Sequence, residues 1–102
     1  MAKLFNLEII TPDKLIYKGE VVSLVAPAEL GYLGVLADHA PLIANTVSGK
    51  ITLRDRSGKG KVFVAKAGGF LQILKNKVTL ILEDVTSDIL TPETRRLTRE
   101  EI

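Results

Sequence analysis

The stretch GGFLQILKNKVTLILED, residues 68–84, decides the fold of this chain, because its apolar residues alternate with others on both sides of a short polar turn. The segment KNK separates two runs that are each long enough for one strand, which predicts a β-hairpin around Asn76. In the second run the two-residue period predicts that Val78, Leu80 and Leu82 point inward and that Thr79 points outward. Such a strand is buried on one face.

The same period runs through the N-terminal part of the chain. In LFNLEII it places Phe5, Leu7 and Ile9 on one face of a strand. The next apolar segment, KLIYKGEVVSLVA, repeats the pattern, and Gly19 predicts a bulge or bend within it. One inward face is expected there to hold Val22, Leu24 and Ala26.

A further hairpin is expected between residues 51 and 67. ITLRDR and KVFVAKA alternate on either side of SGKG, where Gly58 and Gly60 are expected to supply positive φ. About eight to ten short strands follow one another with no helical segment between them. The fold class is therefore all-β, an antiparallel β-sandwich or flattened barrel.

The period is lost near the C-terminus. We expect residues 1–86 to form the β-sandwich domain and residues 87–102 a short helical tail, or the stump of a helical hairpin. Thr91 is suited to cap such a helix and Pro92 to occupy its first position. A chain of 102 residues is long enough for one domain of this kind.

Composition excludes several kinds of site. The chain has no cysteine and one histidine, which rules out disulfides, thiolate nucleophiles and a zinc site built on clustered imidazoles. No apolar run approaches the roughly 20 residues of a membrane span. The N-terminus already has the pattern of a strand, so no targeting segment is expected before it.

Positive charge is concentrated in residues 50–77, where eight lysines and arginines face Asp55 as the only acid. Such a segment is typical either of a nucleic-acid surface or of a solvated or partner-facing basic edge. Binders of single strands combine basic residues with stacking aromatics, and here only Phe63 and Phe70 are available. Phe63 lies in the apolar run VFVA and is expected in the core. The basic edge is the favoured interpretation, and no nucleic-acid partner is expected.

The loop GYLGVLADHAPL, residues 31–42, contains the only histidine, His39. A histidine that acts as a general base needs a carboxylate to orient it and a nucleophile within reach. Asp38 is adjacent in sequence and therefore poorly placed to orient the ring, and the nearby Thr46 and Ser48 carry no nucleophile motif. No catalytic, cofactor-binding or metal-binding residue is predicted, and the loop is interpreted as a contact surface.

Three segments, in this order, resemble the N-terminal domain of the epsilon subunit of F-type ATP synthases. They are LEIITPDKLIYKGEVVSLVAP, GYLGVLADHAPL and AGGFLQILKNKVTLILED, and the resemblance extends from Leu7 to Asp84. It implies a non-catalytic β-sandwich in the rotating central stalk, which links the gamma subunit to the membrane c ring and couples ion-driven rotation to ATP synthesis.

The resemblance also implies partners and a location. The partners are gamma and the c ring, within a complex that contains alpha and beta subunits. The protein would lie on the cytoplasmic side of the bacterial inner membrane, or in the organelle-encoded equivalent, and would associate with the membrane only through the complex. The alternative is a generic β-sandwich adaptor with an unrelated partner, which would show the same strands.

Two sets of contact residues follow from the resemblance. The set expected to contact gamma comprises Thr11, His39, Ala40, Pro41 and Leu42. The set expected to contact the c ring comprises Glu29, Gly31, Tyr32, Leu33 and Gly34. The family often has an acid where Tyr32 stands, so Glu29 is the candidate for an electrostatic contact. The family's common Pro-Gly before the histidine is replaced by Ala37 and Asp38.

The family commonly continues into a C-terminal helical hairpin that inhibits ATP hydrolysis and, in some members, binds ATP. This chain resembles a short form without most or all of that hairpin. Inhibition and ATP binding by such a hairpin are therefore expected to be absent.

Overall fold

A computed structural model describes residues 3–86 as an all-β unit, as the alternating pattern predicts. This range contains nine strands, within the predicted eight to ten. They are β1 (Phe5–Ile10), β2 (Leu15–Ala28), β3 (Gly31–Leu36), β4 (Leu42–Thr46), β5 (Gly49–Asp55), β6 (Gly60–Ala65), β7 (Gly69–Leu74), β8 (Lys77–Leu82) and β9 (Val85–Thr86). The tail expected over 87–102 lies outside the described residues. No helix among residues 3–86 is long and apolar enough to cross a membrane.

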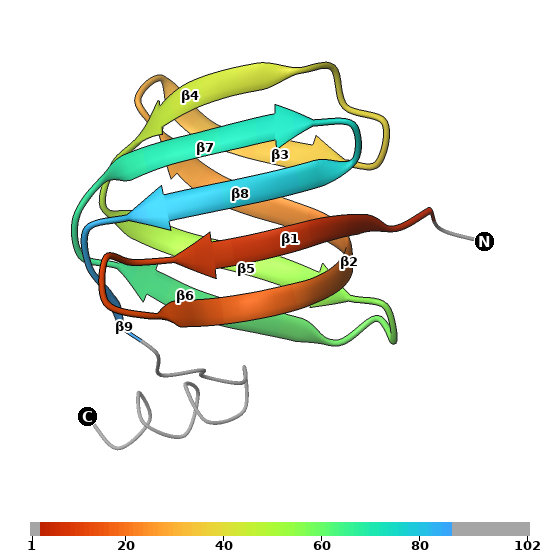
Figure 1. The fold of residues 1–102 in the computed structure, drawn as a ribbon, viewed down its shortest axis with the longest axis horizontal. Coiled ribbons are helices and arrows are strands. Elements are labelled where there is room, and N and C mark those ends of the chain that lie inside the picture. The colour runs from red at the N-terminus through yellow and green to blue at the C-terminus, as the bar shows by residue number, and fades with distance from the viewer. Residues whose placement is uncertain (1–2, 87–102) are drawn as a thin grey trace.

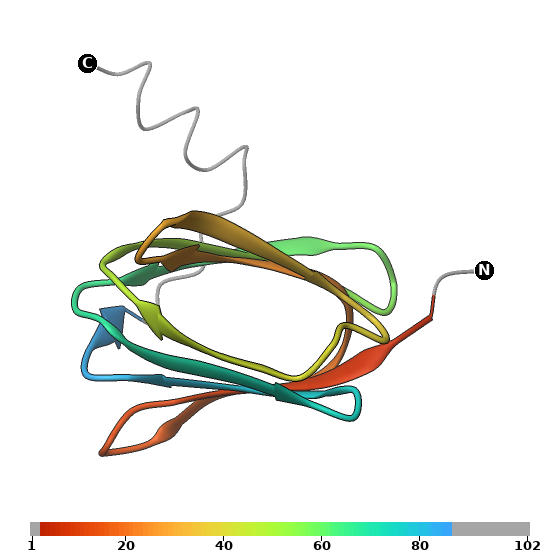
Figure 2. The same ribbon diagram turned by 90° about the horizontal axis from the view of Figure 1, so that it is seen from above.

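The strands form two layers that face each other as the walls of a flattened oval (Figures 1 and 2). One layer contains β1, β8, β7 and β4, and the other contains β3, β2, β5, β6 and β9. Every pairing is antiparallel except that of β1 with β8, which is parallel. The predicted antiparallel sandwich is therefore confirmed with one parallel pair in it.

The long strand β2 joins the two layers. Its first half pairs with β1, and its second half pairs with β3 on the same edge and with β5 on the other. In Figure 1 it curves from the front layer round to the back layer. Because β1 also pairs with β8, the chain is closed into a barrel along this side.

The bend in β2 corrects one expectation of the sequence. A bulge lies where the pairing with β5 passes from Val21 to Ser23, and not at Gly19. The extra residue changes which side chains of β2 point into the core, so Val21 is buried and Val22 is only half-buried. The inward set is therefore Val21, Leu24 and Ala26.

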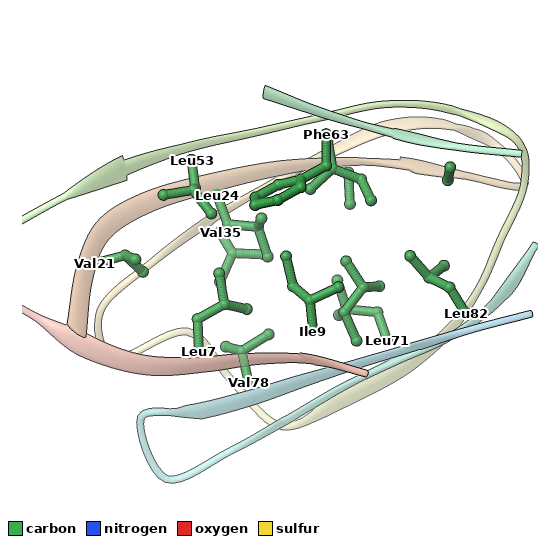
Figure 3. Packing of buried hydrophobic residues seen from close by; sticks show 14 of the residues in the cluster. Leu7, Ile9, Val21, Leu24, Val35, Leu53, Phe63, Leu71, Val78 and Leu82 are labelled. Atoms are coloured by element: carbon green, nitrogen blue, oxygen red, sulfur yellow. The ribbon is translucent and has the colours of Figure 1, made fainter. Parts of the chain in front are cut away.

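The core lies between the two layers (Figure 3). Side chains from both walls point toward one another, and the predicted inward residues of β1 and β8 are among them. Those fully or almost fully buried include Phe5, Leu7, Ile9, Val78, Leu80 and Leu82, together with Phe63 from β6. Such dense packing makes the barrel a rigid support for its loops.

The hairpin around Asn76 is confirmed, with a turn one residue shorter than KNK. Leu74 pairs with Lys77, so only Lys75 and Asn76 form the turn. Their φ angles are 51° and 60°, the left-handed pair that a two-residue type I′ turn requires. In the other hairpin Gly58 has φ of 91°, as expected, but Gly60 has no positive φ because β6 already begins there.

We expect Gly69→Ala to destabilise the barrel by about 3 kcal/mol, because the new Cβ would overlap the backbone carbonyl oxygen of Ile81 in the paired strand. Gly34→Ala is the matched control, since a Cβ there meets nothing within 4 Å. It should change stability by no more than about 0.5 kcal/mol. Urea unfolding measures both, and equal stabilities of the two variants would contradict the described pairing.

Candidate functional site

The two ends of the barrel carry different loops. Because β1 runs parallel to β8, the start of β1 lies beside the turn at Asn76, where the Asn6 N–H donates to the Asn76 carbonyl oxygen (2.9 Å). We call this the Asn76 end. Ile10, the last residue of β1, pairs with Ile81. Thr11 therefore lies at the other end of the barrel, which we call the Thr11 end.

The structure separates the residues expected to contact gamma. The loop that carries His39 lies at the Asn76 end, since the neighbouring Asp38 is hydrogen-bonded to Asn76. Thr11 lies at the opposite end, on the turn between β1 and β2. The resemblance grouped them as one set, but they are not neighbours.

The residues expected to contact the c ring lie at the Thr11 end. Glu29 and Leu30 form the turn from β2 to β3, and the Glu29 N–H donates to the carbonyl oxygen of Asn45 (3.1 Å). Leu30 is fully exposed. Tyr32 points back onto its own sheet, where its hydroxyl accepts a hydrogen bond from the Lys50 N–H (3.3 Å). The tip of this turn, rather than Tyr32, is therefore the most projecting part of the set.

A groove of about 470 Å³ brings members of both expected sets together. It lies between the β2–β3 turn and strand β4. Its walls include Glu29, Leu30 and Leu33 on one side and Leu42 and Ile43 on the other. The groove is mostly apolar and opens to the surface, as a contact surface for another chain would.

A continuous apolar row crosses the outer face from the first half of β2 through β1 and β8 to β7. Ile10 pairs with both Leu15 and Ile81, and Ile81 pairs with Phe70, so the four side chains form one row across four strands. Leu15 and Phe70 are each 53% exposed and Ile81 is 40% exposed. We call this row the apolar strip. It ends at β7, because the partner of Phe70 on β4 is the polar Asn45; the exposed Ile43 lies two residues away along β4, opposite Gln72.

The apolar strip lies beside one of the two separated parts of the expected gamma set. Thr11 directly follows Ile10, a member of the strip, whereas Leu42 pairs with Ile73 nearer the Asn76 end. The strip itself was not predicted from the sequence. Its signal was present, because a period that buries Leu80 and Leu82 leaves Ile81 on the outside.

The outer face of the layer that contains β3, β2, β5, β6 and β9 has a different distribution of apolar side chains. Its exposed apolar residues are interrupted by polar cross-strand neighbours: Val64 pairs with Lys50, and Val25 pairs with Thr52. An uninterrupted apolar row on one face only is typical of a surface that another protein covers.

The histidine has no catalytic arrangement around it. Its Nδ1–H donates to the carbonyl oxygen of Ala40, the next residue (2.8 Å). The Asp38 carboxylate accepts hydrogen bonds from Lys3 Nζ (2.8 Å) and Asn76 Nδ2 (2.9 Å) instead of orienting the ring. Among residues 3–86 no cluster of three or more acidic or histidine side chains is placed to hold a metal ion.

The two aromatic residues of the basic segment lie in different surroundings. Phe63 is buried in the core, as expected, so it offers no stacking face. Phe70 is exposed but lies in the apolar strip on the opposite layer from Arg54 and Lys50. The Asp55 carboxylate is held by the Ser57 hydroxyl and the N–H groups of Ser57 and Lys59, and these hydrogen bonds lower its pKa. These hydrogen bonds order the hairpin tip, and the basic side chains of the tip are exposed to solvent.

Comparison with known proteins gives a consistent result. Residues 4–95 match the family profile described as ATP synthase, Delta/Epsilon chain, beta-sandwich domain. The ATP synthase epsilon chain of Dichelobacter nodosus is 42% identical over 84 residues, which cover 82% of this chain and 57% of that protein. The epsilon chain of Chlorobium limicola is also 42% identical over 84 residues, and there the match covers 94% of the relative. The chain thus spans little more than half of some relatives and nearly all of others.

Solved structures share the fold at low identity. A chain in the mitochondrial ATP synthase of Euglena gracilis superposes with a TM-score of 0.77 at 20% identity, covering 96% of this chain and 62% of that one. A chain in the central stalk and c-ring structure of the Tetrahymena thermophila enzyme gives 0.68 at 13% identity, covering 98% and 90%.

We expect the pKa of the Asp38 carboxyl to lie below its ordinary value, mainly because of the hydrogen bond from Lys3 and next because of the one from Asn76. A lowered folded-state pKa adds stability above the unfolded-state pKa of about 3.9, and this stability is lost as the pH falls through the folded-state value. Lys3→Met should raise the pKa. Carbon-detected NMR titration measures it, with Lys75→Met as the control that should leave it unchanged.

Proposed function

This chain belongs to the ATP synthase delta/epsilon chain family, through its β-sandwich domain, and we propose that it acts as the epsilon subunit of an F-type ATP synthase. In this role it joins the gamma subunit to the membrane c ring in the central stalk, and it transmits ion-driven rotation without catalysing a reaction. The observation that carries the proposal is the apolar strip across the outer face of β2, β1, β8 and β7.

The apolar strip is the proposed binding surface for gamma. It offers Leu15, Ile10, Ile81 and Phe70 in one row, next to Thr11 from the expected gamma set. Burying apolar area of this kind contributes about 25 cal/mol per Å², and aromatic residues such as Phe70 are frequent energetic centres of interfaces. The loop residues His39, Ala40 and Pro41 would extend the contact at the Asn76 end.

The tip of the β2–β3 turn is the proposed contact with the c ring. Glu29 and Leu30 form this turn at the Thr11 end and are both exposed, and Gly31, Tyr32, Leu33 and Gly34 follow them on β3. An exposed carboxylate beside an exposed leucine suits a partner with basic and apolar groups at the same point.

The remaining assignments follow from this role. The chain would work within a complex that contains alpha and beta subunits and would reach the membrane only through that complex, on the cytoplasmic side of a bacterial inner membrane. The alternative, an adaptor with an unrelated partner, would use the same strip. Specific binding to gamma separates the two.

We expect Phe70→Ser and Ile81→Ser each to weaken gamma binding about tenfold, because each removes apolar contact area from the strip. Val64→Ser is the matched control, since Val64 is 37% exposed and Ile81 is 40% exposed but they lie on opposite outer faces. Isothermal titration with purified gamma measures the affinities. Equal affinities for all three variants, or no binding by the unaltered chain, would reject the proposed role of the strip.

We expect Glu29→Lys to lower ATP-driven ion transport about threefold in vesicles reconstituted with the complex, because it reverses the charge of the proposed c-ring contact. The loss should shrink at high salt, which screens exposed charges. Glu83→Lys, which changes another exposed acid at the Thr11 end, serves as the control. Transport that is the same in both variants would contradict the assignment of Glu29.

A further inference from the structure

Asp38 and Asn76 hold each other across 38 residues of sequence. The Asp38 N–H donates to Asn76 Oδ1 (2.6 Å), and Asn76 Nδ2–H donates back to Asp38 Oδ1 (2.9 Å). We call this reciprocal pair the latch.

Both residues of the latch have the left-handed backbone conformation. Asp38 has φ of 66° and Asn76 has φ of 60°. Aspartate and asparagine tolerate this region better than other residues with a side chain. The latch therefore uses two residue types that suit the backbone and can also hydrogen-bond to each other.

Lys3 adds an ion pair to the latch. Its Nζ lies 2.8 Å and 3.1 Å from the two carboxylate oxygens of Asp38. This ion pair holds the start of the chain beside the same loop. The Asp38 and Lys3 side chains are 59% and 65% exposed, so solvent screens this ion pair and its contribution to stability is small.

The latch acts on a loop that no strand pairing supports. Residues 37–41 cross from β3 in one layer to β4 in the other, whereas the Asn76 turn belongs to the tight hairpin of β7 and β8. Tying the loop to this hairpin transfers the rigidity of the hairpin to the loop. A loop that is already ordered loses less conformational entropy when a partner binds it.

We propose that Asp38 and Asn76 are positioning residues that preorganise the 37–41 loop for gamma, so that His39 and Pro41 are presented in a fixed conformation. This inference rests on the proposed function and deepens it. The latch would contribute to gamma affinity through the loop and without touching gamma itself.

Glycine variants isolate the side chains of the latch. Asp38→Gly and Asn76→Gly keep a residue that accepts positive φ. Asn76→Gly removes both hydrogen bonds of the latch, whereas Asp38→Gly removes the bond from Asn76 Nδ2 and keeps the one donated by the backbone N–H of residue 38. Asp38→Asn is the conservative variant, because its amide oxygen still accepts from Asn76 and only the ion pair with Lys3 is removed.

The first readout is amide hydrogen exchange at residue 38 in the free chain. Asn76→Gly removes the acceptor of the Asp38 N–H, and we expect exchange there to become about tenfold faster. Exchange at the core residue Leu80 should be unchanged. Unaltered exchange at residue 38 would show that the latch does not form in solution and would overturn the proposal.

The second readout is gamma affinity by titration calorimetry. Each glycine variant should weaken binding about fivefold, and the double variant no more than the stronger single one, because the two side chains act as one unit. Asp38→Asn should stay within about twofold of the unaltered chain.

The outcomes separate this proposal from the proposed function. Phe70→Ser is included as a reference for gamma binding through the apolar strip. If Phe70→Ser weakens binding and Asn76→Gly speeds amide exchange at residue 38 yet both glycine variants bind gamma normally, the positioning role is wrong and the proposed function stands. If the unaltered chain does not bind gamma, both fail together.

Discussion

The whole structure depends on β1, which is paired along both edges. One edge pairs with β2 in antiparallel fashion and the other with β8 in parallel fashion, so this single short strand joins the start of the chain to its last hairpin. Leu7 and Ile9, at the centre of β1, have no exposed surface. Because β1 closes the barrel, the loops at each end and the outer face between them are held in fixed relative positions.

That fixed outer face is what the proposed function requires. A subunit that transmits rotation must not deform between the part that is driven and the part that responds. Here the apolar strip crosses four strands whose inner faces are packed into one core, and the exposed turn at Glu29 extends from the same barrel. A force applied at the turn therefore reaches the strip through paired strands and core packing rather than through a flexible linker.

The local part of this fold could be read from the sequence, and the long-range part could not. The period of two correctly placed Leu80 inward and identified the hairpin at Asn76, because both depend on neighbouring residues. The prediction that Val22 points inward was wrong, because the bulge that turns its side chain away from the core arises from pairing with a strand about thirty residues later in the chain. The parallel pairing of β1 with β8 likewise has no local signal.

The candidate site divides in the same way. The resemblance supplied His39 and Thr11 as contact residues, but only the pairing shows that they lie at opposite ends of the barrel. The apolar strip beside Thr11 required knowledge of which strands are neighbours, because Ile81 and Phe70 become a continuous surface only when their strands are in register. The latch between Asp38 and Asn76 depends on the same long-range arrangement.

The most direct test of this account is cysteine labelling of the assembled complex, which is practical because the chain has no cysteine of its own. Single cysteines would replace Phe70 in the strip and Val64 on the opposite outer face, and their maleimide reactivity would be compared in the free chain and in the complex. The account predicts that assembly slows labelling at position 70 by roughly tenfold or more and leaves position 64 unchanged. Equal reactivity at position 70 in the free and assembled states would contradict it.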